Sequence, residues 1–354
     1  MTTDSTSERY ELITRGLQEV IGGDYLLDVM RERQPNGYWG TAPTGRIHVG
    51  YLCPAMKLRD IVNAGCNLTI LIADMHAFLD NLKTPFEQIK ARTKYYIKMI
   101  QTILTIMGVD HTKVKFVVGS DYQLTPQVTL ELFKLASVTK LSDASKAGTE
   151  VVKQTKDPFL TSLLYPLLQA LDEKFLNADF EIGGIDQRKI FTYGKDFLPK
   201  IGIVRRFTHL MNPIVPGLST KKSDGATVKM SASDASSKID LLDTPEDIKK
   251  KVMKSYCLDG DAVDNSCLQI IKNLVFPLVH EFSILRSDDY GGNLRFADYI
   301  ALETMVGTKS TEGGIHPVDL KNSLAAFLID FLAPIREAFS SEECQEILKE
   351  AYGT

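Results

Sequence analysis

In the first third of the chain, short apolar runs alternate with long amphipathic helical patterns, and this alternation restricts the fold more than any other feature. Residues 36–43, 67–79 and 113–122 predict strands, the second of which runs into a loop. The helical patterns between them, 48–65 and 84–108, are long enough for the crossovers that parallel strands require. We therefore expect an α/β fold: a Rossmann-like, doubly wound parallel sheet whose ligand lies at the carboxyl ends of the strands.

Turn and cap residues mark the ends of these elements. Gly108 closes the second helical pattern, and Thr84 with Pro85 suits the N-cap and first position of that helix. The stretch from Glu8 to about Arg33 predicts an N-terminal helical segment.

Two later changes of pattern divide the chain. A mostly helical stretch, about 121–176, interrupts the alternation and predicts an insertion, after which strand, glycine turn and helix resume. From Thr244 onward the pattern indicates helices only, and Thr244, Pro245 and Asp247 form a capping arrangement. We expect an α/β domain over 1–234, with a mobile Gly/Ser/Thr/Lys-rich loop at 217–237, and an α-helical C-terminal domain over 235–354.

Composition excludes several classes of protein. No apolar run approaches the roughly 20 residues of a membrane span, and the N-terminus lacks a signal-peptide pattern, so a cytoplasmic protein is expected. The net charge of −4 provides no general attraction to nucleic acid. The five cysteines are odd in number and scattered, which argues against structural zinc and a disulfide framework; they are Cys53, Cys66, Cys257, Cys267 and Cys344.

The stretch "GTAPTGRIHVGY", Gly40–Tyr51, is thin in side chains where a strand turns into a helix. Backbone N–H groups of the first helical turn are expected to be unpaired there and to attract phosphate. Gly50 leaves room for a ring or ribose, and His48 can donate a hydrogen bond to a phosphate oxygen. The alternative is a tight turn in which His48 acts only as a cap.

Two further motifs suggest nucleotide chemistry. In "IGGIDQRK", Ile182–Lys189, the glycines permit close approach and Asp186 can accept hydrogen bonds from ribose hydroxyls, although an N-cap role is the alternative. In "KMSASD", Lys229 can reach over a bound triphosphate, and Ser231 and Ser233 add hydroxyl donors. The alternative for this motif is a solvated linker.

Together, "HVGY" and "KMSAS" resemble the two signature motifs of class I aminoacyl-tRNA synthetases. With "YWGTAPTG", "ADMHAFLDN", "YPLLQALDEKFL", "GGIDQRKIF" and "MNPIVPGL", nearly the whole chain resembles the tyrosyl-tRNA synthetase family of archaeal and eukaryotic cytosolic type. Two positions depart from the pattern: Tyr51 replaces a second histidine, and Ala232 replaces a second lysine. Because both side chains are missing, we expect His48 and Lys229 to make more of the contacts to the phosphates.

The resemblance implies ATP-dependent activation of tyrosine, release of pyrophosphate and transfer of the tyrosyl group to the terminal ribose of tyrosine tRNA. Such a displacement depends on positioning and electrostatic stabilisation, with Mg²⁺ accompanying ATP, and needs neither a nucleophilic side chain nor structural zinc. By the same resemblance, residues 1–234 form the catalytic domain and 235–354 an anticodon-binding domain.

The resemblance also implies a tyrosine pocket. Tyr38 and Asp172 would hold the phenolic hydroxyl, and Tyr165, Gln169 and Gln187 the ammonium and carboxylate end. Spacing supports part of this set independently, because Tyr165, Gln169 and Asp172 stand at i, i+4 and i+7 on one face of a predicted helix. The alternative is an exposed polar face.

Further positions follow from the resemblance alone. Gly40 and His76 would line the tyrosine pocket, although a lone histidine after an apolar strand is also typical of a structural role. The residues that would bind ATP are Thr44, His48, Gly50, Gly184, Asp186, Met211 and Lys229, and those with a catalytic role are His48, Lys229, Ser231 and Ser233.

For tRNA, the resemblance points to the C-terminal domain. Tyr290 would stack on an anticodon base, and Asp319 would accept hydrogen bonds from a guanine edge. The family is a homodimer, and the insertion helices around Gln127–Ala147 would form its interface.

Two alternatives stay open from the sequence. Tryptophanyl-tRNA synthetases share the fold and similar motifs, although two oxygen-bearing side chains, Tyr38 and Asp172, favour a phenol. A catalytically silent, RNA-binding relative is the second alternative, but such a protein needs none of His48, Asp186 and Lys229.

Overall fold

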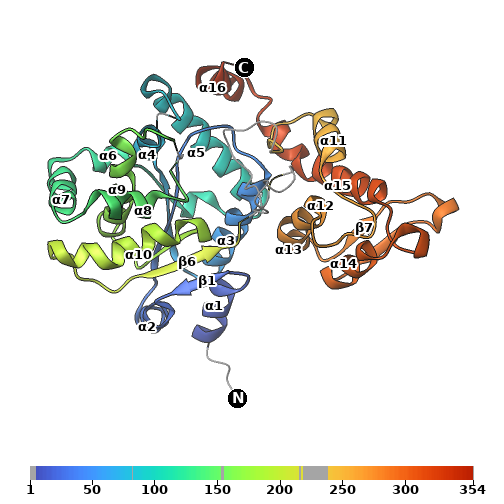
Figure 1. The fold of residues 1–354 in the computed structure, drawn as a ribbon, viewed down its shortest axis with the longest axis horizontal. Coiled ribbons are helices and arrows are strands. Elements are labelled where there is room, and N and C mark those ends of the chain that lie inside the picture. The colour runs from blue at the N-terminus through green and yellow to red at the C-terminus, as the bar shows by residue number, and fades with distance from the viewer. Residues whose placement is uncertain (1–4, 82, 153–154, 215–216, 218–237, 354) are drawn as a thin grey trace. The chain divides into compact units, whose positions relative to one another are not determined.

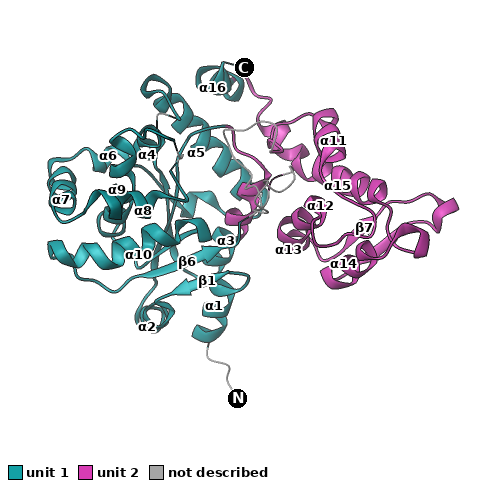
Figure 2. Ribbon diagram, in the orientation of Figure 1, with its two compact units in different colours: residues 1–45, 57–214, 343–354 teal, residues 46–56, 215–342 magenta. Residues whose placement is uncertain are grey.

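The computed structural model describes residues 5–81, 83–152, 155–214, 217 and 238–353. They form two compact units (Figure 2): unit 1 contains residues 1–45, 57–214 and 343–354, and unit 2 contains 46–56 and 215–342. This division differs from the expected linear one at 46–56 and 343–354. The expected boundary at 234 and the loop at 217–237 lie almost wholly outside the described residues, so both stay predictions.

Unit 1 is built on a six-stranded sheet in the order β1-β6-β5-β2-β3-β4 (Figure 1). All neighbouring strands are parallel except β1, which pairs antiparallel with β6 at one edge. The chain runs from β2 toward β3 and β4 on one side and returns to β5 and β6 on the other, so the strand order reverses between β2 and β5. The strands are β1 (Glu19–Ile21), β2 (Asn36–Thr41), β3 (Asn67–Ile72), β4 (Lys115–Val118), β5 (Phe180–Gly184) and β6 (Thr208–Asn212).

This arrangement confirms the doubly wound α/β fold, and the reversal is the place where such folds bind ligands. Four helices lie between β4 and β5, as the sequence predicts for the insertion. The helices of this part of the chain are α1 (Ser5–Thr14), α2 (Gly23–Glu32), α3 (Leu52–Asn63), α4 (Asp74–Leu79), α5 (Ile89–Ile106), α6 (Ser120–Gln123), α7 (Pro126–Ser137), α8 (Leu141–Gly148), α9 (Thr161–Phe175), α10 (Arg188–Phe197) and α16 (Glu342–Tyr352).

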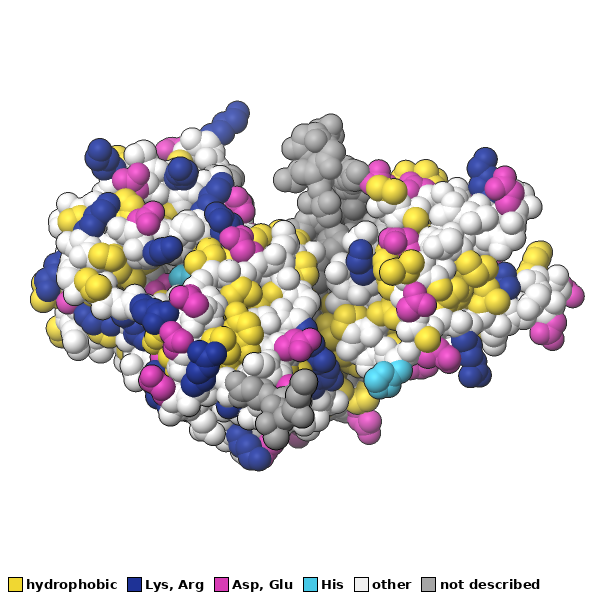
Figure 3. All heavy atoms as spheres, turned by 90° about the horizontal axis from the view of Figure 1, so that it is seen from below, with side chains coloured by type: hydrophobic (Ala, Val, Ile, Leu, Met, Phe, Trp, Pro, Cys, Tyr) yellow, Lys and Arg dark blue, Asp and Glu magenta, His cyan; other side chains and the backbone are white. Residues whose placement is uncertain are grey.

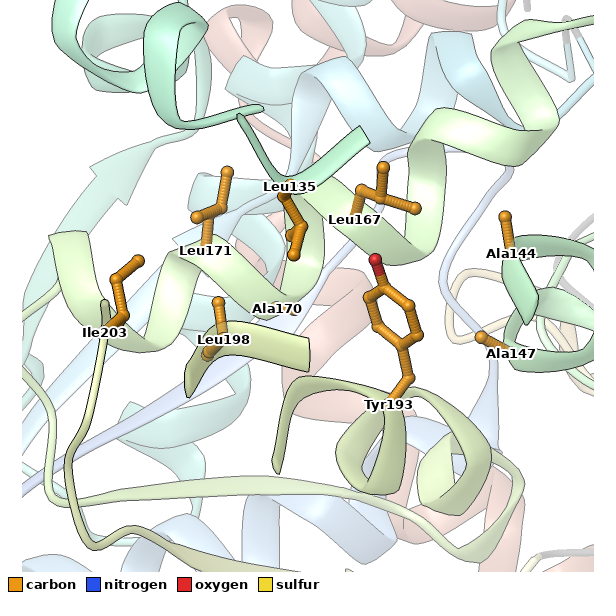
Figure 4. Close-up of a cluster of buried hydrophobic side chains, with 9 residues drawn as sticks. All are labelled: Leu135, Ala144, Ala147, Leu167, Ala170, Leu171, Tyr193, Leu198 and Ile203. Atoms are coloured by element: carbon orange, nitrogen blue, oxygen red, sulfur yellow. The ribbon is translucent and has the colours of Figure 1, made fainter. Parts of the chain in front are cut away.

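The insertion helices share a core with α10 (Figure 4). Leu135 of α7 and Leu171 of α9 are fully buried, and the Tyr193 ring rises from α10 toward the helix that carries Leu167. The Tyr193 hydroxyl is also within 2.7 Å of the Thr139 hydroxyl. This packing anchors α9, which carries three of the predicted pocket residues.

The segment 343–354 completes unit 1 by packing on α5. Lys94 of α5 pairs with Glu350 at 3.1 Å, and the rings of Tyr95 and Tyr352 meet edge to face. The Arg92 guanidinium lies over the Tyr352 ring and donates to the carbonyl oxygen of Thr44.

Unit 2 is mainly helical, as expected, but the prediction of helices only is wrong. Residues 282–284 and 294–296 pair as a two-stranded antiparallel sheet. The predicted cap is confirmed, since the Thr244 side chain accepts the Asp247 N–H. The elements are α11 (Pro245–Lys254), α12 (Ser266–Ile270), α13 (Phe276–Leu278), β7 (Phe282–Ile284), β8 (Leu294–Phe296), α14 (Tyr299–Gly307) and α15 (Pro317–Ala338).

Three local expectations in unit 1 are also wrong. The N-terminal segment is not continuous helix, because β1 separates α1 from α2. The segment after β3 forms α4 and not a loop. Thr84 does not cap α5, because its hydroxyl is buried and donates to the Pro43 carbonyl, and a short 3-10 turn, Phe86–Gln88, precedes the helix. Within the described ranges, no helix has the length and apolar character to cross a bilayer.

Candidate active site

Asp172 of α9 lies at the centre of a polar cluster in unit 1 and is 1% exposed. Its Oδ1 accepts hydrogen bonds from the Tyr122 hydroxyl at 2.6 Å and from Gln123 Nε2 at 2.8 Å. Its Oδ2 is buried and, among the described residues, has no hydrogen-bond partner. Burial raises the pKa of Asp172 to about 7, against the opposing effect of these two hydrogen bonds.

Tyr38 of β2 provides a second buried polar atom without a partner. The side chain is 1% exposed, and its hydroxyl makes no hydrogen bond within the part of the chain that the structure describes. Burial raises the pKa of Tyr38 well above its usual range, and the nearby carboxylates of Glu181 and Asp172 raise it further. Tyr38 is therefore a neutral phenol that can both donate and accept.

His76 of α4 completes this end of the cluster. Its Nε2 lies 4.0 Å from Asp172 Oδ2, and its ring meets the Tyr165 ring edge to face at 4.6 Å. Burial lowers the pKa of His76 to about 3, so the imidazole is neutral and does not form an ion pair with Asp172.

Two glutamine amides lie at the other end of the cluster. Gln169 of α9 donates from Nε2 to Glu181 Oε1 and to Gln187 Oε1, both at 3.1 Å. Tyr165, one turn before Gln169, is 8% exposed, and burial raises its pKa well above the usual range. The three α9 residues therefore share one largely buried face, and the alternative of an exposed polar face is wrong.

The glycine pair at the end of β5 is required by space and not by backbone angle. A Cβ on Gly183 would lie 2.7 Å from Phe191 Cζ and 3.0 Å from Gln187 Cγ. A Cβ on Gly184 would lie 2.3 Å from Asp186 Oδ1. Only glycines at these positions let the side chains of Asp186 and Gln187 fold back over the strand end.

The remaining unit 1 residues of the predicted set lie on or just after the same strands. Gly40 of β2 has only ordinary contacts around the site of a Cβ, the nearest being Leu71 at 3.7 Å. The Thr44 carbonyl accepts from Arg92, and Met211 of β6 is fully buried with its carbonyl accepting the Gln18 N–H. Their assigned contacts with substrate stay predictions.

The signature motif around His48 belongs to unit 2. The expectation of unpaired N–H groups is wrong: Val49 N–H donates to the Ile239 carbonyl at 3.0 Å, Gly50 N–H to His48 Nδ1 at 3.2 Å, and Tyr51 N–H to the His48 carbonyl at 2.9 Å. A segment distant in sequence takes the Val49 N–H, and His48 itself takes the other two. The His48 ring thus caps the turn, and acceptance at Nδ1 leaves the neutral ring protonated at Nε2, which is a donor.

The segment that pairs there follows the predicted signature loop. Leu241 N–H donates to the Ile47 carbonyl at 3.2 Å, and Lys238 Nζ donates to the Arg46 carbonyl at 2.8 Å. Arg46 also pairs with the buried Asp240 at 3.0 Å. The chain that carries the loop is thus anchored beside His48; Lys229, Ser231, Ala232 and Ser233 lie outside the described residues.

The predicted anticodon residues both lie in unit 2. Tyr290 ends a short 3-10 turn and is 76% exposed, as a stacking side chain requires. Asp319 is in the first turn of α15 and is partly exposed.

Three residues of the cluster escape the sequence prediction: Tyr122, Gln123 and Glu181. Tyr122 and Gln123 follow β4, so their position at a strand end is the signal that identifies them. Glu181 is a charged residue inside an otherwise apolar strand, β5, and such a residue is unusual in a central strand.

One group among the described residues has metal-binding spacing: Glu173, Glu181 and His209, whose ligand atoms lie within 4.8 Å of one another. His209 Nε2 already pairs with Glu173 Oε1 at 2.8 Å, and Glu181 accepts from Gln169. These contacts give the group a hydrogen-bonding role without an ion.

Comparison with known proteins agrees with the fold. The family model "tRNA synthetases class I (W and Y)" matches residues 30–333. The chain is 42% identical over 361 residues to the cytoplasmic tyrosine–tRNA ligase of Saccharomyces cerevisiae, covering 99% of this chain and 89% of the relative. It is 48% identical over 351 residues to the chicken cytoplasmic tyrosine–tRNA ligase, covering 99% of this chain but only 64% of the relative. The chain thus spans less than two thirds of the vertebrate relatives that it matches.

A solved structure gives the same result. The tyrosyl-tRNA synthetase of Archaeoglobus fulgidus, solved with L-tyrosine, superposes with a TM-score of 0.82 at 33% identity, covering 94% of this chain and 99% of that one. The chain belongs to the class I tRNA synthetases of the W and Y family, and within it to the tyrosyl-tRNA synthetases of archaeal and eukaryotic cytoplasmic type.

Proposed function

We propose that the chain is a tyrosine–tRNA ligase. The observation that carries this proposal is a pair of buried polar atoms without partners, the Tyr38 hydroxyl and Asp172 Oδ2. A buried polar atom without a partner costs about 1–3 kcal/mol, so a ligand that satisfies both gains affinity from each. A phenol does so by accepting from Tyr38 and donating to Asp172. An indole has one N–H and no oxygen, so it leaves the Tyr38 donor unsatisfied.

The reaction begins with activation of tyrosine. A carboxylate oxygen of tyrosine bonds to the α-phosphorus of ATP as the bond from that phosphorus to its bridging oxygen breaks, giving tyrosyl-adenylate and pyrophosphate. The chain's contribution is to position the reactants and to stabilise developing charge. Tyr165, Gln169 and Gln187 hold the amino-acid end in place, with Gly40 and His76 lining the pocket.

The nucleotide is held by the strand ends and the two signature motifs. Gly184 lets the Asp186 side chain fold back over the strand end, where it accepts from the ribose hydroxyls. Thr44 follows β2 and Met211 lies near the end of β6, and both contact the nucleotide. His48 donates from Nε2 to a phosphate oxygen beside Gly50, and Lys229, Ser231 and Ser233 add charge and donors. Mg²⁺ enters with the phosphates of ATP and offsets their charge.

The second step passes the tyrosyl group from the adenylate to a terminal ribose hydroxyl of tyrosine tRNA, releasing AMP. Recognition of that RNA requires local contacts, because the net charge is −4 and charged side chains of both signs are interspersed on the face that Figure 3 shows. We assign Tyr290 to stacking on an anticodon base and Asp319 to a guanine edge.

A homodimer accounts for apolar side chains on the insertion. Leu130 and Phe133 of α7 are 55% and 67% exposed, and Leu141 at the start of α8 is 73% exposed. Exposed apolar side chains gathered on neighbouring helices are typical of a protein interface. The names of the chicken and yeast relatives further support a cytoplasmic location for the chain.

The test is ATP–pyrophosphate exchange with tyrosine and, separately, with tryptophan, followed by charging of tyrosine tRNA. We expect exchange with tyrosine only. Exchange with tryptophan alone would support the tryptophanyl alternative, and exchange with neither would support a silent RNA-binding protein. Lys229→Ala should slow exchange at least ~100-fold while tyrosine affinity stays nearly unchanged; an unchanged exchange rate would remove the loop from the mechanism.

A further inference from the structure

Glu181 is the only charged residue of β5 and is 4% exposed. Its Oε1 accepts from Gln169 Nε2 at 3.1 Å, and its Oε2 is buried and has no hydrogen-bond partner among the described residues. Burial of a carboxyl group in a central strand costs desolvation free energy that an apolar residue would not cost. Its presence therefore points to a role that an apolar residue cannot serve. Its hydrogen bond with Gln169 indicates that role.

The Gln169 amide has two N–H donors, and both are used inside the protein. One donates to Glu181 Oε1 and the other to Gln187 Oε1. The carbonyl oxygen of Gln169 is then the only group that this amide can offer to a ligand. Gln187 uses its own carbonyl oxygen toward Gln169, so its NH₂ group is what it can offer.

An amide at this position has two orientations, and a pocket lined by Gln169 and Gln187 alone would not choose between them. If both amides turned over, Gln187 would donate to Gln169, and the offered groups would be exchanged. Only an acceptor on the far side of Gln169 distinguishes the two states, because an acceptor there requires the NH₂ group to face it.

We propose that Glu181 is a positioning residue that fixes the polarity of the amino-acid end of the pocket, so that Gln169 presents an acceptor to the ligand's ammonium and Gln187 a donor to its carboxylate. This inference rests on the proposed function, since it deepens the same pocket. Glu181 acts through Gln169 and does not itself contact the ligand.

The charge of Glu181 is not needed for this role. Burial and the neighbouring carboxylate of Glu173 raise the pKa of Glu181 well above its usual range. The neutral carboxyl group still offers a carbonyl oxygen as an acceptor. A glutamine at this position offers this acceptor in only one of its two amide orientations, and methionine, which has similar length, offers none.

The test compares binding of tyramine, which has the phenol and the ammonium, with binding of 4-ethylphenol, which has only the phenol. Calorimetry on the full chain gives the dissociation constant of 4-ethylphenol divided by that of tyramine. This ratio measures recognition of the ammonium alone. We expect Glu181→Met to reduce this ratio ~10-fold, because tyramine loses that much more affinity than 4-ethylphenol does. Glu181→Gln should reduce the ratio less than Glu181→Met does, because glutamine can still turn its carbonyl oxygen toward Gln169.

Three controls make the result specific. Glu173→Gln changes a buried carboxylate that pairs with His209 and touches neither amide, so it should leave the ratio unchanged. In a Gln169→Met background, Glu181→Met should have no further effect, because the amide through which it acts is absent. Glu181→Leu repeats the test in case the methionine variant does not fold.

Each outcome bears on the proposal. An unchanged ratio in Glu181→Met, or additive effects in the double variant, would overturn it. Equal losses in the methionine and glutamine variants would also overturn it, because they would show direct attraction by the Glu181 charge. If the original chain binds neither tyrosine nor tyramine, the proposed function fails as well; binding of both with an unchanged ratio removes the positioning role alone.

Discussion

Asp172→Asn is expected to stabilise the fold at alkaline pH while it removes selectivity for tyrosine. Burial raises the pKa of Asp172 from 3.8 to about 7, so between these values the folded chain binds more protons at this site than the unfolded chain does. The free energy of unfolding therefore falls as pH rises through this window, by about 4 kcal/mol in all. Asparagine does not titrate, so the variant avoids this loss. The free energy of unfolding of the variant minus that of the original chain should rise by about 2.5 kcal/mol between pH 5 and pH 8.

The same substitution changes the pocket at one atom. Asparagine keeps an oxygen that can accept from Tyr122 and Gln123, but an NH₂ group replaces the Oδ2 that the proposed phenol donates to. Loss of a hydrogen bond to a charged acceptor costs about 1.5–3 kcal/mol, so tyrosine affinity should fall roughly 10- to 100-fold. Phenylalanine lacks the hydroxyl, so its affinity should not fall.

Urea unfolding at pH 5 and pH 8 measures the first effect, and calorimetry with tyrosine and phenylalanine the second. Asp179→Asn is the matched control. Asp179 is also buried, but its hydrogen bonds with Arg33 and Asn36 hold its pKa below the usual value, so its stabilising effect is already complete at pH 5. The control should destabilise the chain equally at both values of pH. A constant stability difference for Asp172→Asn, or an unchanged ratio of tyrosine to phenylalanine affinity, would refute the reasoning.

Three other changes test separate parts of the structure. Gly183→Ala places a Cβ 2.7 Å from Phe191 and 3.0 Å from Gln187, so steady-state exchange should show a KM for tyrosine raised about 10-fold, and a normal KM would mean that the strand end relaxes without moving Gln187. Phe133→Asp should shift the proposed dimer to monomer, weakening association at least ~100-fold by analytical ultracentrifugation, and an unchanged sedimentation coefficient would place the interface elsewhere. Removing residues 343–354 deletes three buried apolar side chains, Cys344, Leu348 and Ala351, and exposes the surface that they cover. The loss of stability should be roughly 3–5 kcal/mol, which lowers the melting temperature by about 10 °C. An unaltered melting temperature would show that this segment does not stabilise unit 1.

The predictable part of the fold is the part that repeats a local pattern. The strands at 36–41 and 67–72 and the helices after them follow from apolar runs, glycine stops and crossover length, all of which are visible within about 20 residues. The capping at Thr244 is equally local. By contrast, β1 has three residues and exists because β6 offers it a partner nearly 190 positions later, which no local pattern contains.

The site divides in the same way. The face that Tyr165, Gln169 and Asp172 share follows from helical spacing, and the strand-end position of the pocket follows from the fold class. The pairing of the Val49 N–H does not follow from either, because its partner Ile239 lies across a long connection. The hydrogen bond from Gln169 to Glu181 does not follow either, because it joins a helix to a strand and depends on how the two pack.

Because residues 343–354 pack on α5, unit 1 is completed only at a late stage of synthesis. All six strands of the sheet have been synthesised by residue 212, but residues 343–354 belong to the same unit and follow only after 215–342. During that interval the surface around Tyr95 and Arg92 has no cover from Tyr352. A sheet that forms before then has this helix surface exposed to solvent, and unit 1 is complete only after residues 215–342 have been synthesised.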